Sequence, residues 1–90
     1  MALRVNYDGE TDILHVMRDP RVDGGSLAYG VTGRDGFTRR FSGDGLPVGA
    51  LIVGYREAGW PGRRGELARR LSRHFGICSR DVLRVLRALR

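Results

Sequence analysis

Arginine is the residue of this chain whose type and spacing point most directly to chemistry. All sixteen basic residues are arginine, and nine of them follow residue 60, where Glu66 and Asp81 are the only acids. The first sixty residues carry seven arginines against eight acids, so the net charge is −1 before residue 61 and +7 after it. Guanidinium groups bind phosphate and carboxylate oxygens through paired hydrogen bonds. The basic segment is therefore expected to face an anionic partner.

Seven arginines of this segment are the candidate binding residues. We predict that they contact nucleic-acid phosphates or an acidic protein surface: Arg64, Arg69, Arg70, Arg73, Arg80, Arg84 and Arg87. Phosphate contacts give an affinity that falls steeply with salt and carries little sequence information. Two alternatives stay open, a solvated helix face and the codon bias of a genome rich in G and C, which also fits the fourteen glycines. Codon bias accounts for the choice of arginine, but not for its concentration after residue 60.

The two histidines define the catalytic alternative. A small basic ribonuclease of toxin type would use His15 or His74 for proton transfer, and arginines to stabilise the phosphate. The simpler interpretation places His15 in a strand and makes His74 a cation near a helix C-terminus. We therefore predict a non-enzymatic protein without catalytic residues.

Metal and cofactor sites are not expected. Asp8, Glu10 and Asp12 lie close together, but turn chemistry explains them. The histidines and Cys78, the single cysteine, lack the spacing of a zinc site. One cysteine fits a reducing compartment, and neither a secretory signal nor an apolar run of about 20 residues is evident. We expect a cytoplasmic protein without a membrane segment.

Period-two alternation of apolar residues predicts a sheet in the first part of the chain. The predicted strands cover residues 3–7, 13–17, 27–31, 37–41 and 46–55. Residues 46–55 are apolar on both faces, which is typical of the most buried strand. Turn residues separate the strands: loops are expected at Pro20 and at Asp23-Gly24-Gly25, and hairpin turns at residues 33–36 and 43–45.

After Trp60, which we expect to fix the joint to the core, the apolar spacing becomes helical. One helix is predicted over residues 63–75 and a second from residue 80 to near the chain end. Gly76 is expected as a left-handed C-terminal cap, and Ser79 as the N-cap of the second helix. The predicted fold is α+β, with an antiparallel β-meander of four or five strands (3–56) followed by a helical hairpin (63–90) packed on the sheet. The whole chain, 1–90, is expected to form one domain.

Two stretches of the first part share a recognisable pattern. Val5-Asn6-Tyr7-Asp8 combines a strand with a tyrosine-aspartate turn, and an acidic residue opens the apolar strand Asp12-Ile13-Leu14-His15-Val16. Gly43-Asp44-Gly45 then leads into a strand around Val48-Gly49. These features resemble a bacterial and archaeal family of very short proteins called domain of unknown function 2283. The resemblance covers residues 3–55 and leaves the basic helices uncovered.

The resemblance implies a fold for residues 3–55 and, because some relatives lie beside small toxin genes, an antitoxin-like role. It implies no functional residue. From the residues themselves we predict a small interaction module that binds an anionic partner through its arginine-rich helices. The alternatives are the ribonuclease and a purely structural homo-oligomer. A homodimer through a sheet edge is expected under several of these interpretations, because small sheets expose edges that pair with a second copy.

Overall fold

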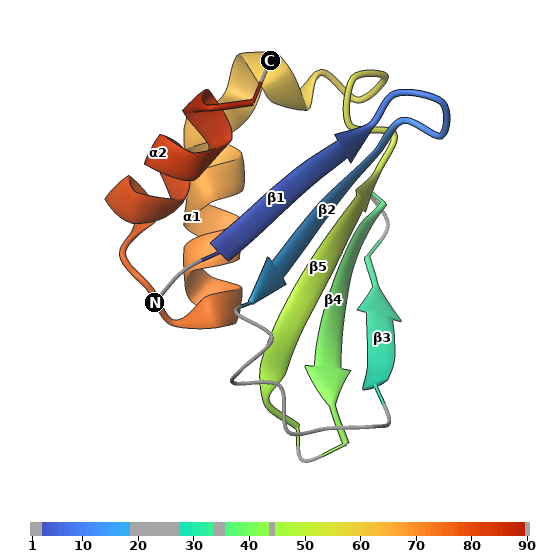
Figure 1. Cartoon of the computed structure of the whole chain (residues 1–90), viewed down its shortest axis with the longest axis vertical. Helices are drawn as coiled ribbons and strands as arrows, with labels where there is room; N and C mark the ends of the chain where they lie inside the picture. Colours follow the sequence, from blue (N-terminus) through green and yellow to red (C-terminus); the bar gives the residue numbers. More distant parts are fainter. Residues whose placement is uncertain (1–2, 19–27, 34–35, 44, 90) are drawn as a thin grey trace.

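A five-stranded antiparallel sheet and two helices form the protein (Figure 1). The computed structural model describes residues 3–18, 28–33, 36–43 and 45–89. The elements are β1 (Leu3–Asp8), β2 (Ile13–Arg18), β3 (Ala28–Thr32), β4 (Phe37–Ser42), β5 (Pro47–Val53), the short 3₁₀ helix η2 (Trp60–Arg63), α1 (Arg64–Phe75) and α2 (Ser79–Arg87). The predicted α+β class, with a sheet followed by a helix pair, is confirmed.

The strand order in the sheet is β1-β2-β5-β4-β3. Strands β1 and β2 form one hairpin, β3 to β5 form a three-stranded meander, and β5 joins the two parts by pairing with β2. The strand with the most continuous apolar sequence is therefore the central one. The loops predicted at Pro20 and at Asp23-Gly24-Gly25 lie outside the described residues, as do Arg34, Asp35 and Asp44 of the two predicted turns.

Alternation along the strands separates a covered face of the sheet from an open one. Leu14 and Val16 of β2 and Ala50 and Ile52 of β5 are buried, in one cluster with residues of both helices. Val53 at the end of β5 is 48 % exposed. Both helices lie on one side of the sheet, as Figure 1 shows. The strand predicted to be apolar on both faces is thus covered on one.

A turn built around Asp12 ties the first hairpin to the segment that leads to the helices. Asp12 has a positive φ of 56°, and its carboxylate accepts the hydroxyl of Tyr7 at 2.6 Å and the amides of Arg56 and Glu57 at 2.9 and 3.1 Å. The hydrogen bond from Tyr7, followed by that from the Arg56 amide, lowers the pKa of Asp12. Asp8 likewise accepts the Glu10 amide at 3.0 Å. The predicted turn chemistry of these carboxylates is confirmed.

The helix pair is fixed to the sheet by an apolar stripe. Trp60 in η2 is 1 % exposed, and Leu67, Leu71 and Phe75 of α1 are buried at helical spacing. Gly76 ends α1 with a φ of 70°, so the predicted left-handed cap is confirmed.

The predicted N-cap is wrong by one residue. Helix α2 already begins at Ser79, and Cys78 occupies the N-cap in an extended conformation without a side-chain hydrogen bond. The reason lies in the backbone, since the Cys78 carbonyl already accepts the amides of Asp81 and Val82. Ser79 therefore lies inside the first turn.

Candidate anion-binding site

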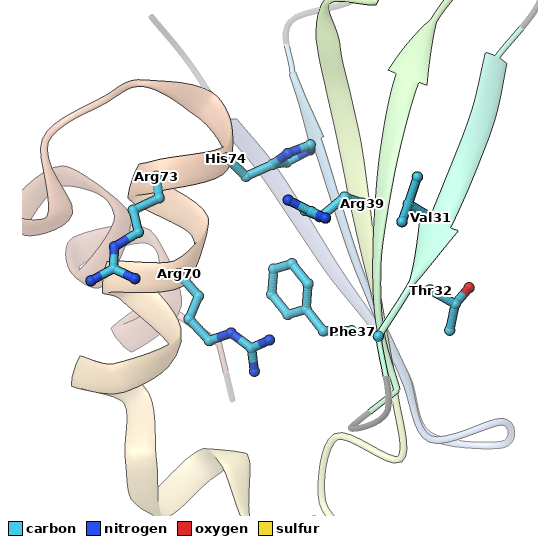
Figure 2. Close-up of a pocket in the computed structure, with 8 residues that line it drawn as sticks. Val31, Thr32, Phe37, Arg39, Arg70, Arg73 and His74 are labelled. Carbon is cyan, nitrogen blue, oxygen red and sulfur yellow. The ribbon is translucent and has the colours of Figure 1, made fainter.

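A cleft of about 460 Å³ lies between α1 and the outer strands of the sheet (Figure 2). Its described lining residues are Val31, Thr32, Gly33, Phe37, Arg39, Arg70, Arg73 and His74. Three of these eight are arginines, and none is an aspartate or a glutamate. Figure 2 shows Arg70 and His74 extending from α1 toward β4, where Phe37 and Arg39 lie, while Arg73 extends along the outer side of the helix. The described lining is cationic.

The sheet is wider than the helix pair, and this difference creates the cleft. Helix α1 packs on β5 and α2 packs on β1. Arg39 pairs with the buried Ala50 and lies between Phe37 and Phe41 in the alternation of β4, so it belongs to the covered face. An arginine is tolerated at this position because the helices do not extend over β4 fully, and Arg39 remains exposed.

Arg70 is held against aromatic rings at the base of the cleft. Its guanidinium lies 4.6 Å from the ring centroid of Phe37 and 5.6 Å from that of Trp60. These distances are typical of cation–π contacts, which restrict the side chain. Phe37 is only 3 % exposed, so its ring contributes packing and is not open for stacking on a base.

His74 is a structural residue of the cleft wall. Its Nε2 donates to the carbonyl of Gly49 at 2.7 Å, and its ring packs edge-on against Phe41 and Phe75. Burial lowers the pKa of His74, and the positive charge of Arg39 lowers it further. Desolvation and the neighbouring guanidinium both disfavour the protonated form, so the pKa shift runs against the expectation that His74 is a cation.

A second hollow of about 390 Å³ adjoins the cleft along α1 and is lined by Glu66, Arg69, Arg70 and Arg73. Glu66, the acid of this hollow, forms an ion pair with Arg63 at 3.0 Å. We call the combined surface of Arg39, Arg69, Arg70 and Arg73 the arginine cleft. The arginine cleft combines one strand residue with helix residues that are at least thirty positions further along the chain.

The other predicted arginines lie elsewhere. Arg64 is half-buried beside Tyr7 and Tyr55 in a small hollow of about 70 Å³. The arginines of α2 are exposed and do not line the cleft: Arg80, Arg84 and Arg87. The structure thus brings together Arg69, Arg70 and Arg73 and separates the remaining four from them.

Arg39 is the residue that the sequence-based prediction missed. A signal was present, because Arg39 alternates with Phe37 and Phe41 and so shares the face of two aromatic residues. A cation on the apolar face of a strand has to lie at an open margin of the core.

The structure does not bring the two histidines together. His15 alternates with the buried Leu14 and Val16 and therefore lies on the open face, opposite His74. No group of three histidine, cysteine, aspartate or glutamate residues that could hold a metal ion occurs among the described residues. What the arginine cleft can do chemically is bind an anion.

No family model matches the chain, and no similar curated protein or solved structure is found. The resemblance of residues 3–55 to domain of unknown function 2283 stays a prediction. Among the described residues, no helix is long and apolar enough to cross a membrane. The function is therefore argued from the geometry of the site.

Proposed function

We propose that this protein is a non-enzymatic module that binds the phosphate backbone of nucleic acid through the arginine cleft. The observation that supports the proposal is that Arg39 from β4 and Arg70 and Arg73 from α1 line one cleft of about 460 Å³, with no acidic residue in its described lining. Glu66 lines only the adjoining hollow, where it pairs with Arg63. The net charge of +6 would also speed the encounter with a polyanion.

The lining favours phosphate contacts over recognition of bases. Asparagine and glutamine, the side chains that read adenine, are absent from the described lining, so base contacts there would be limited to arginine with guanine. Stacking on single-stranded bases needs an exposed aromatic ring, whereas Phe37 is covered by Arg70. The proposed binding is therefore largely independent of sequence.

An acidic protein is the other class of anionic partner. A concave site suits a narrow anionic chain, since a phosphodiester backbone can enter the cleft while the flat surface of a folded protein meets only its rim. We therefore argue for nucleic acid and use an acidic polymer as the competitor in the test. An antitoxin-like role in the cytoplasm, the setting in which the exposed Cys78 would stay reduced, is compatible with this function.

The test is a fluorescence-anisotropy titration of the purified chain with a labelled RNA strand and a labelled DNA duplex. We expect binding that weakens with salt, and a loss of affinity in the double variant Arg39→Ala/Arg73→Ala. Arg84→Ala on α2 is the matched control, because it removes an exposed arginine outside the cleft. Absence of binding at low salt would overturn the proposal.

Two further readouts separate the alternatives. Polyglutamate that binds more tightly than either nucleic acid would favour an acidic protein partner. Gel analysis of the RNA after incubation tests the ribonuclease, for which cleavage that disappears in His74→Ala would be required.

A further inference from the structure

The open face of the sheet carries four apolar side chains around His15 on its two central strands. Its residues follow from the strand register and form three rows across four strands. The first row is Arg4, Met17, Gly49 and Arg40, the second is Asn6, His15, Leu51 and Thr38, and the third begins with Asp8, Ile13 and Val53. Met17 is 51 % exposed and Val53 is 48 % exposed.

This pattern is unusual for a solvated sheet face. An antiparallel sheet covered on one side commonly places polar residues on the other side. Here the two central strands, β2 and β5, carry Ile13, Met17, Leu51 and Val53 on that side. Contiguous apolar patches of this kind mark interaction sites. The helices lie on the opposite side of the sheet (Figure 1).

Charge is distributed along the strands of this face. Arg4 and Arg40 flank the first row, whereas Asp8 flanks the third row, beside the turn that contains Glu10. One end of the face therefore carries positive charge at its margins and the other end carries an acid, while the apolar residues lie on the two central strands. The complement of such a surface is the same surface turned end for end.

Gly49 offers no side chain of its own to the open face. A Cβ at Gly49 would lie 3.1 Å from the Val16 carbonyl and 3.8 and 4.0 Å from the Cβ and Cδ of Arg40, so the Arg40 side chain borders this position. Val53 lies two rows away on the same strand and protrudes. Turning the face end for end about the middle row places Val53 of one copy over Gly49 of the other.

We propose that this face is the interface of a homodimer whose twofold axis lies in the interface plane, along the middle row of residues. Strands then run in opposite directions across the interface, and Arg4 of each copy faces Asp8 of the other. The alternative axis, parallel to the strands, would place Arg4 against Arg40 of the other copy. Like charges in direct opposition destabilise an interface, so the charge pattern selects the first arrangement.

The dimer is expected to be weak. Four strands at about 4.8 Å spacing and five residues at about 3.4 Å rise give a patch of roughly 19 Å by 17 Å. This area is below the roughly 800 Å² that each partner buries in a standard interface. We therefore expect dissociation on dilution through the micromolar range.

Sedimentation velocity over a dilution series tests the proposal. The wild type should shift from dimer to monomer on dilution, and Met17→Lys/Val53→Lys should be monomeric throughout. Both side chains are half-exposed in the monomer, so the fold should persist, which circular dichroism checks. Val31→Lys is the matched control, because Val31 is 43 % exposed and lies on the helix side of the sheet; it should leave the dimer intact.

A charge swap tests the orientation. Arg4→Glu alone and Asp8→Arg alone should each weaken the homodimer at least tenfold, whereas a mixture of the two variants should form heterodimers in which both contacts are again attractive. A wild type that stays monomeric at millimolar concentration would overturn the proposal. A dimer that survives Met17→Lys/Val53→Lys would do so as well and would indicate pairing through a sheet edge.

Discussion

The salt dependence of nucleic-acid binding can be worked out from the arginine cleft. If Arg39, Arg69, Arg70 and Arg73 each neutralise one phosphate of a DNA duplex, four counterions are released. The slope of log K against log salt concentration is then about −3.6. A fourfold rise in salt, from about 50 to 200 mM, should weaken binding by about 150-fold at that slope.

The double variant Arg39→Ala/Arg73→Ala should halve this dependence. Two remaining contacts give a slope of about −1.8, so the same rise in salt weakens binding by only about 12-fold. These two arginines are the appropriate ones to remove, because both are exposed, whereas Arg70 also packs on Phe37 and Trp60. Removal of Arg70 would therefore mix a loss of binding with a loss of packing.

The assay is anisotropy at four or more salt concentrations, repeated with two unrelated duplex sequences of equal length. The two sequences should give the same slope and similar affinities, since phosphate contacts carry no sequence information. Arg84→Ala should leave the slope unchanged. A slope that falls in Arg84→Ala and not in the double variant would refute the argument that the cleft is the binding surface.

The remaining predictions concern stability. Burial lowers the pKa of His74 in the folded chain, so its contribution to stability should be complete above its unfolded pKa of about 6.5 and should be lost as the pH falls from there through the lower folded pKa. Urea midpoints measured against pH should show this slope, and His74→Gln should flatten it. Leu71→Ala should lower the free energy of unfolding by about 2–5 kcal/mol, because Leu71 is fully buried between helix and sheet. A decrease well below that range in urea unfolding would mean that the helices contribute little to the core. Gly76→Ala should lower the free energy of unfolding by about 1–2 kcal/mol, because Gly76 has a left-handed φ. Gly65→Ala in α1 should raise it by about 0.5–1 kcal/mol, because an added Cβ meets nothing within 4 Å. Equal effects of the two substitutions in thermal melts would contradict the capping argument.

Local sequence patterns predicted the strands and helices well, because each strand or helix depends on residues that are close in sequence. Alternation located β1, β2 and β4 within one or two residues, and Gly76 marked the end of α1. The order of strands in the sheet is a different kind of property. Placement of β5 between β2 and β4 depends on pairing over more than thirty residues, and periodicity does not contain that information.

In the candidate site too, local patterns predicted some residues and tertiary packing decided the others. Arg69, Arg70 and Arg73 were predicted because they recur on one helix, but so were four arginines that lie outside the cleft. Arg39 joins the site only because β4 extends past the edge of α1. A helical pattern identifies the face that an arginine occupies, whereas the neighbour across that face is decided by tertiary packing.

The two proposals, taken together, constrain how the protein would act. The arginine cleft lies on the helix side of the sheet, and the proposed dimer interface lies on the opposite side. A dimer would therefore carry its two clefts outward, on opposite sides, so that one short duplex could not fill both. The dimer would instead bridge two nucleic-acid segments, and the affinity of each cleft for a short duplex should be the same in the dimer as in the monomer obtained on dilution. Equal occupancy of both clefts by a single short duplex would show that one of the two surfaces is assigned to the wrong side.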